Sequence, residues 1–283
     1  MYPFAFFGSP RFADVVLKEL IEGGYLPSVL VCNPDRPVGR KRVVTPPATK
    51  ERILSDKEGI RENVEILQPE TKKELVELKE RFKNCEFAVV AAYSKIIPKE
   101  VLEVFPKGVI GVHPSLLPKH RGPSPIQGAL LEGVGETGVT LYLLDEETDH
   151  GDILANSKLQ IANGETYEML EEKLATLGGE LLVRTLPSFL AGEIKPKEQD
   201  HSQATFTKMI HTEDGLVDLE KDSPIVIDRK IKALNPEPGV YTIQDGKRVK
   251  LLEGRWEDEV FVITKTLPEG KKVREAHIVL KKN

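Results

Sequence analysis

Residues 111–118, Gly-Val-His-Pro-Ser-Leu-Leu-Pro, hold the densest cluster of side chains that could take part in a reaction. His113 closes an apolar run, and Pro114 after it keeps its backbone extended. A histidine at the carboxyl end of a strand can act as an acid or a base near neutral pH. Because an isolated strand-end histidine is more often simply hydrogen-bonded, this hypothesis needs a second element.

The acidic segment 145–152, Asp-Glu-Glu-Thr-Asp-His-Gly-Asp, is that second element. It follows the apolar run 139–144. If both runs are parallel strands of one sheet, the two segments leave the same edge and a carboxylate can lie beside His113. Such a carboxylate would favour the charged imidazole and fix its tautomer. Taken alone, an acidic loop is usually a solvated turn, and its several oxygens also leave a cation site open.

Short apolar runs alternate with helix-like segments through the first two thirds of the chain. The pattern predicts an α/β fold, a doubly wound and mostly parallel sheet of the Rossmann type. Ligands bind at the carboxyl ends of the strands in such sheets. The helix candidates are 12–21 and an amphipathic segment, 165–186, which Pro187 ends or bends. The strand candidates are 4–7, 28–32, 87–92, 109–113 and 139–144.

The last third of the chain has a different pattern. We predict a catalytic domain over 1–190, a polar linker over 191–204 and a small β domain over 205–283. Short strand candidates at 240–243, 249–252, 260–264 and 277–280 are separated by Asp-Gly and Glu-Gly turns. They favour a small barrel, OB-like and shorter than usual, or a meander.

Composition limits the class of protein. The chain has 283 residues, 40% hydrophobic and 30% charged, as in ordinary globular proteins. No apolar run approaches the roughly 20 residues that span a bilayer, and the first residues lack the features of a signal peptide. Cys32 and Cys85 are expected to be unpaired thiols. We predict a cytoplasmic monomer with no membrane partner.

Charge is unevenly distributed. The net charge is -5, yet residues 223–283 carry thirteen Lys and Arg against nine Asp and Glu. A second basic patch lies in 33–50, where only Asp35 opposes the cations Arg36, Arg40, Lys41, Arg42 and Lys50. A charge run is usually solvated surface. Two basic patches on an acidic body can also hold phosphates locally.

The order and spacing of several short motifs resemble the folate-dependent formyltransferases. They are 111–118, Arg-Gly-Pro-Ser-Pro-Ile-Gln at 121–127, Glu-Thr-Gly-Val-Thr at 136–140 and Thr-Asp-His-Gly-Asp at 148–152. Within that family the chain is most similar to the branch that acts on methionyl-tRNA. Its motifs match at 7–13, 33–40 with Thr45-Pro46, 92–98, 204–206 and 229–239. The resemblance covers nearly the whole chain and fades after about Leu252.

This resemblance implies a reaction and its participants. The donor is 10-formyltetrahydrofolate, the acceptor is the α-amino group of initiator methionyl-tRNA, and no metal is required. His113 would stabilise the formyl oxygen and move protons, and Asp149 would orient His113. The folate would lie along Ser115, Leu116, Leu117, Pro118, Tyr93, Ser94 and Ile96. The acceptor stem would be held by Arg36, Arg40, Lys41 and Arg42.

One catalytic position departs from the family's motif. Gly111 stands where the family has an asparagine whose amide is thought to donate to the developing oxyanion. Losing one such donor typically lowers the rate by roughly a hundred- to a thousand-fold. Three accounts stay open: a water fills the vacated space, a residue from another segment reaches in, or catalysis is slow. Ser94, often glycine in this branch, is a milder change.

Other functions compete with this one. An N-formyltransferase of amino-sugar nucleotides would share the catalytic core but would not need the basic segment 33–50. A tRNA- or folate-binding homologue impaired by Gly111 is the non-enzymatic alternative. A dinucleotide-dependent dehydrogenase is disfavoured, because Phe7-Gly8-Ser9-Pro10 lacks the glycine spacing of a pyrophosphate loop.

Overall fold

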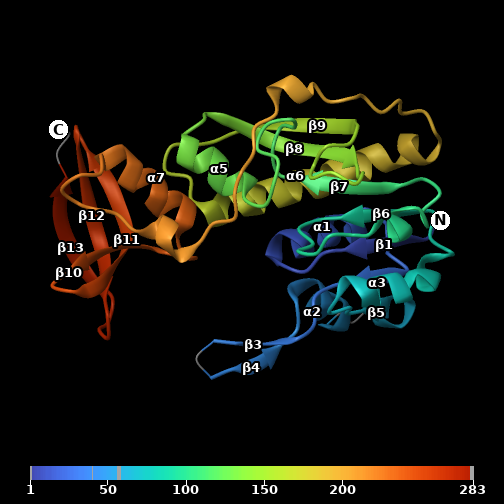
Figure 1. Ribbon diagram of the computed structural model, residues 1–283, viewed down its shortest axis with the longest axis horizontal. Helices are drawn as coiled ribbons and strands as arrows, with labels where there is room; N and C mark the ends of the chain where they lie inside the picture. The colour runs from blue at the N-terminus through green and yellow to red at the C-terminus, as the bar shows by residue number, and fades with distance from the viewer. Residues whose placement is uncertain (1, 40, 56–58, 281–283) are drawn as a thin grey trace. The chain divides into compact units, whose positions relative to one another are not determined.

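The computed structural model describes residues 2–39, 41–55 and 59–280 (Figure 1). Two compact units divide the chain. The first comprises Met1–Arg121, Gly138–Leu159 and Glu171–Thr205. The second comprises Gly122–Thr137, Gln160–Leu170 and Phe206–Asn283. Each unit is therefore assembled from segments that are distant in sequence.

A seven-stranded sheet forms the centre of the first unit, in the order β5-β2-β1-β6-β7-β8-β9. The pairs β5-β2, β2-β1, β1-β6 and β6-β7 are parallel, and β8 runs antiparallel to β7. The mostly parallel α/β sheet that the sequence predicts is thus confirmed. The strands are β1 (Phe4–Phe7), β2 (Val29–Val31), β5 (Glu65–Leu67), β6 (Phe87–Val90), β7 (Val109–His113), β8 (Glu136–Leu143) and β9 (Ile153–Gln160).

Burial explains why these segments are strands. All four residues of β1 are buried, as expected for a strand covered on both faces. The Phe7 ring contacts the rings of Phe82 and Phe105, with centroids 5.6 and 6.3 Å away. The helices of this part of the chain are α1 (Arg11–Glu22), α2 (Ala48–Ser55), α3 (Lys72–Glu77), α4 (Lys99–Leu102) and α6 (Tyr167–Leu190), with 3-10 turns at Ile60–Asn63, Lys79–Phe82 and His201–Gln203.

Helix α6 packs unusually close to the sheet and to α1. A Cβ atom at Gly178 would lie 2.8 Å from Cγ1 of Val112 in β7, and one at Gly179 would collide with the Glu19 side chain. Two adjacent glycines therefore let the helix backbone approach on both sides. The helix continues through Pro187 to Leu190, so the alternative in which Pro187 ends it is wrong.

A separate hairpin occupies the segment that resembles an extended loop. Strands β3 (Arg36–Val38) and β4 (Val43–Thr45) pair antiparallel, with Arg36 opposite Thr45 (Figure 1). At its base, the Lys50 ammonium donates to the Asp35 carboxylate and to the Gln68 amide oxygen, at 2.8 Å each. Lys50 is thus committed to holding the hairpin. Among the described residues, no helix is long and apolar enough to cross a membrane.

The second unit combines two helices with an antiparallel sheet. The sheet order is β10-β11-β12-β13, so the described strands form a meander, the second of the two predicted arrangements. Trp256 Nε1 and Lys232 Nζ both donate to the buried Asp228 carboxylate, at 3.0 and 2.7 Å, which ties α7 to β11. The elements are α5 (Pro125–Glu132), α7 (Pro224–Leu234), β10 (Val240–Gln244), β11 (Lys247–Glu257), β12 (Val260–Pro268) and β13 (Arg274–Leu280).

Both cysteines are unpaired and buried, as predicted. Burial raises the pKa of the Cys32 thiol to about 12 and that of Cys85 to about 11. Since only the thiolate is a good nucleophile, we expect neither to be alkylated by iodoacetamide in the native protein at pH 8. Mass spectrometry should show both labelled after unfolding in guanidinium. Rapid labelling of the native protein would show that the two thiols are not buried.

Candidate active site

His113 lies at the end of β7 with 7% of its side chain exposed. Its Nε2 is 2.9 Å from the backbone oxygen of His120, and its Nδ1 is 3.6 Å from Oδ2 of Asp149. A carbonyl oxygen can only accept a hydrogen bond, so Nε2 must carry a hydrogen. Nδ1 is therefore the ring nitrogen that can gain or lose a proton, and it faces a carboxylate.

The segment that carries Asp149 reaches His113 by a route that the sequence analysis did not anticipate. Because β8 is antiparallel to β7, with His113 opposite Thr140 and Ile110 opposite Leu143, the two segments do not leave the same sheet edge. The expectation of a shared strand edge is therefore wrong. The chain leaves β8 near the start of β7 and turns back to bring Asp149 beside His113.

Several interactions hold this returning segment in place. The Tyr142 hydroxyl donates to Oδ1 of Asp149 at 2.7 Å. The buried Gln199 amide donates to the backbone oxygens of Asp149 and Gly151, at 3.0 and 2.7 Å. Asp149 itself adopts a left-handed backbone, φ 50°, which is costly for a residue with a side chain. Such a conformation persists only where the surrounding contacts impose it.

The space beside Gly111 is filled by the Tyr142 ring. Gly111 and Tyr142 are opposite each other in the β7-β8 pair. A Cβ atom at residue 111 would lie 2.6 Å from Cζ of that ring and 2.7 Å from Cδ1 of Leu144. The account in which a water fills a vacated space is therefore wrong. A neighbouring side chain occupies it instead.

Sequence reasoning missed two residues that support the site, Arg121 and Gln199. Arg121 is 3% exposed and its guanidinium donates to Oε1 of Gln199 at 2.7 Å and contacts Nδ1 of His201 at 2.9 Å. Gln199 lies in the polar segment 191–204, which belongs to the first unit and is bonded to β9 through the backbones of Lys197 and Ile153. Arg121 stood inside a family motif, but nothing in the composition around Gln199 marked it as buried.

Comparisons with known proteins identify the family. The formyl transferase family model matches residues 3–186, and the model of the formyl transferase C-terminal domain matches residues 209–278. This chain belongs to the formyl transferase family. The resemblance expected from the motifs is thereby confirmed, and the chain is a formyltransferase by descent.

Individual relatives agree with this assignment. The chain is 41% identical over 250 residues to a methionyl-tRNA formyltransferase of Chloroflexus aurantiacus, covering 88% of this chain and 78% of that one. Its fold is similar to HypX from Aquifex aeolicus in complex with tetrahydrofolic acid, with a TM-score of 0.67 and 20% identity over 97% of this chain and 46% of HypX. It is also similar to methionyl-tRNA formyltransferase from Clostridium thermocellum, with a TM-score of 0.61 and 17% identity over 98% and 100% of the two chains.

The residues expected to line the formyltransferase's folate site follow two neighbouring strands. Tyr93, Ser94 and Ile96 come after β6, and residues 115–118 come after β7, to which β6 is parallel. Ser115 is fully buried and its hydroxyl donates to the backbone oxygen of Lys119 at 2.6 Å. Its side chain therefore shapes the loop from within.

The three expected folate residues after β6 differ in environment. Ile96 is 80% exposed, and Ser94 exchanges hydrogen bonds with the Asn33 side chain. The Tyr93 hydroxyl is buried with no hydrogen-bond partner among the described residues, and burial raises the pKa of Tyr93 to about 12. An unsatisfied buried hydroxyl is costly unless a ligand completes it.

The expected tRNA-binding residues lie on the hairpin. Arg36, Lys41 and Arg42 are all exposed, whereas Arg40 lies outside the described residues. Within the part of the chain that the structure describes, no group of three or more His, Cys, Asp or Glu side chains could hold a metal ion.

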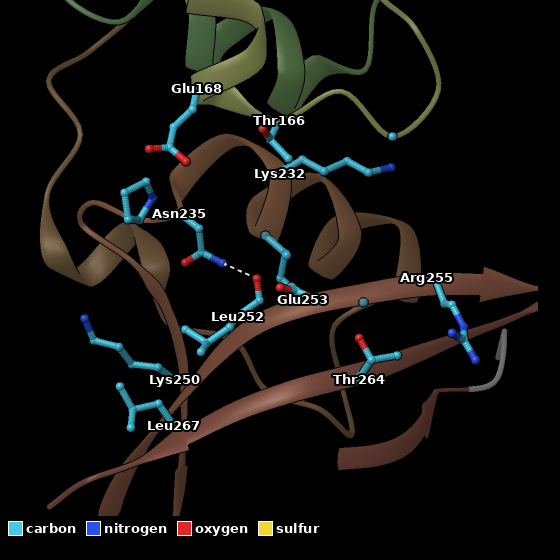
Figure 2. A pocket seen from close by; sticks show the side chains of 14 residues that line it. Thr166, Glu168, Lys232, Asn235, Lys250, Leu252, Glu253, Arg255, Thr264 and Leu267 are labelled. Atoms are coloured by element: carbon cyan, nitrogen blue, oxygen red, sulfur yellow. Dashed lines mark hydrogen bonds between the residues drawn. The ribbon is translucent and has the colours of Figure 1, made fainter. Parts of the chain in front are cut away.

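A cavity of about 650 Å³ lies within the second unit (Figure 2). The Asn235 amide donates to the Leu252 backbone oxygen at its wall. Three cations and two acids line it: Lys232, Lys250, Arg255, Glu168 and Glu253. None of the residues that the sequence predicts for the active site borders this cavity.

We expect Gln199→Ala to loosen the segment that carries Asp149, because one buried and one partly buried backbone oxygen lose their donor. Leaving such groups unsatisfied typically lowers the free energy of unfolding by about 1–3 kcal/mol. Thermal unfolding should detect the loss, and hydrogen exchange should quicken at residues 149–152. The control is Gln160→Ala, which removes an exposed amide bonded only to Glu136. Equal effects of the two variants would contradict the role given to Gln199.

Proposed function

We propose that this chain transfers the formyl group of 10-formyltetrahydrofolate to the α-amino group of initiator methionyl-tRNA. The observation that carries the proposal is the His113–Asp149 pair, 3.6 Å apart, within a chain 41% identical to a methionyl-tRNA formyltransferase. The pair supplies a base and an acid beside each other in a largely buried site, as transfer between two nitrogen atoms requires.

The reaction can be written with these two residues. The neutral amine attacks the formyl carbon, a C–N bond forms, and negative charge gathers on the formyl oxygen. Asp149 accepts a proton from the attacking nitrogen, and His113 stabilises the oxygen. The bond to N10 of the folate then breaks as that nitrogen takes a proton from the pair. The products are the formamide and tetrahydrofolate.

The loops after β6 and β7 fit a folate co-substrate. They leave one edge of two adjacent parallel strands, where ligands of doubly wound sheets bind. The unpartnered hydroxyl of Tyr93 offers a donor to a heterocycle bound there. Ser94, Ile96 and residues 115–118 complete the proposed wall.

The charged surfaces fit a nucleic-acid acceptor. The exposed Arg36, Lys41 and Arg42 of the hairpin, with Arg40 beside them in sequence, would hold acceptor-stem phosphates. We assign catalysis to 1–190 and RNA binding to 205–283, with 191–204 as the linker. Within 205–283, Lys232, Lys250 and Arg255 offer further cations. This role places a monomeric enzyme in the cytoplasm, where translation starts.

The proposal is tested by formylation with labelled donor and two acceptors, methionyl-tRNA and an amino-sugar nucleotide. We expect product only on the tRNA. His113→Asn and Asp149→Asn should lower kcat/KM by roughly a hundred- to ten-thousand-fold, the range of acid–base catalysis. Glu146→Gln changes an exposed acid of the same segment that pairs with Lys99 among the described residues, and it should leave kcat/KM unchanged. Formylation of the sugar nucleotide alone would overturn the proposal, and binding of both substrates without product would favour the impaired homologue.

The hairpin gives a separate prediction. Replacing Lys41 and Arg42 together by alanine should raise the KM for tRNA several-fold and leave the KM for folate unchanged, because only the RNA carries a chain of phosphates. The increase should shrink as salt concentration rises. Replacing the exposed pair Lys72 and Lys73 of α3 removes the same charge elsewhere and should have no such effect. An unchanged KM for tRNA would exclude the hairpin from binding.

A further inference from the structure

We propose that Gly111 and Tyr142 form an exchanged pair across β7 and β8, in which the Tyr142 ring occupies the space of a side chain at residue 111 and its hydroxyl positions Asp149 for the transfer. The functional half of this inference, that the Tyr142 hydroxyl positions Asp149, rests on the proposed function. The packing half, that the Tyr142 ring occupies the space beside Gly111, rests on the structure alone. The two can be tested separately.

Residue 111 has to be a glycine because of the neighbouring Tyr142 ring, and its backbone conformation alone would allow other residues. Gly111 is absent from the glycines with positive φ, so an ordinary residue could adopt its conformation. It is fully paired within the sheet, opposite Tyr142. A Cβ atom would collide with the end of the Tyr142 ring that carries the hydroxyl. The polar end of Tyr142 thus occupies the volume into which a side chain from residue 111 would extend.

The hydroxyl takes up a defined task at that place. Tyr142 is 6% exposed, and its hydroxyl donates to Oδ1 of Asp149 at 2.7 Å. The other carboxylate oxygen, Oδ2, is the one that faces His113. One oxygen is therefore fixed by a neutral donor while the other is left for proton transfer. A carboxylate held at one oxygen loses its freedom to rotate away from the imidazole.

The phenol keeps its proton while it does this. Burial, followed by the charge of Asp149, raises the pKa of Tyr142 well above its usual value. Asp145 raises that pKa further, and Arg121 opposes the shift. The hydroxyl is consequently a permanent donor over the working range of an enzyme.

The packing half is tested by thermal unfolding, with no substrate present. Gly111→Asn should lower Tm by several degrees in the native background, since it overpacks a full site. In a Tyr142→Leu background, which removes the end of the ring, the same change should cost far less. Gly178→Ala, which overpacks a different contact with β7, should cost the same in both backgrounds. An equal cost of Gly111→Asn in both backgrounds would overturn the exchanged pair.

The functional half is tested by Tyr142→Phe, which keeps the ring and removes only the donor. We expect kcat to fall about ten- to a hundred-fold, the range for losing a hydrogen bond to a charged group. KM for both substrates should stay near native values, because the hydroxyl positions a carboxylate and binds neither substrate. Tm should fall by a few degrees, because one carboxylate oxygen loses its donor. Tyr2→Phe, which removes a hydroxyl from a half-exposed ring, should leave kcat unchanged.

The Tyr142→Phe measurement decides the positioning role. A native kcat for this variant would overturn it. If the native protein formylates no methionyl-tRNA, the proposed function fails, and the unfolding measurements still decide the pair.

Discussion

The site depends on keeping the Asp149 carboxylate against the His113 imidazole. A buried carboxylate is costly unless hydrogen bonds replace its water, and this one sits on a backbone conformation that side chains rarely adopt. Tyr142 satisfies one carboxylate oxygen, and Gln199 ties down the backbone at Asp149 and Gly151. The strained segment is thereby held both at its side chain and at its backbone. The residues that hold it, Tyr142 and Gln199, are distant from each other in sequence.

A rigid support lies beneath these contacts. His113 projects from β7, whose neighbour on one side is the parallel strand β6 and on the other the antiparallel strand β8. On its face, α6 approaches Val112 so closely that Gly178 leaves no room for a Cβ atom. A strand clamped on three sides holds its end residue within the small tolerance that proton transfer demands. Strands β6 and β8 and helix α6 therefore together fix the position of the His113 imidazole.

Sequence reasoning succeeded where burial leaves a direct imprint. Strands such as β1 and β6 are covered on both faces, and their sequences are continuous apolar runs. His113 could be placed at the end of a strand because the apolar run that precedes it stops there. An apolar run does not show whether its strand is parallel or antiparallel to its neighbour, however. The antiparallel orientation of β8 was therefore not predicted, and the path of the chain to Asp149 was wrongly inferred. Gln199 could not be found, because a buried amide that is bonded to backbone looks in sequence like any polar residue of a linker.

Gly111 shows why a missing motif residue has to be judged with its neighbours across the sheet. Taken along the chain, the glycine is a lost donor beside His113. Across the pair β7-β8, the Tyr142 ring occupies the space beside Gly111, and its hydroxyl donates to Asp149 instead. Dense packing couples the two positions, because neither a side chain at residue 111 nor a void there is compatible with the ring.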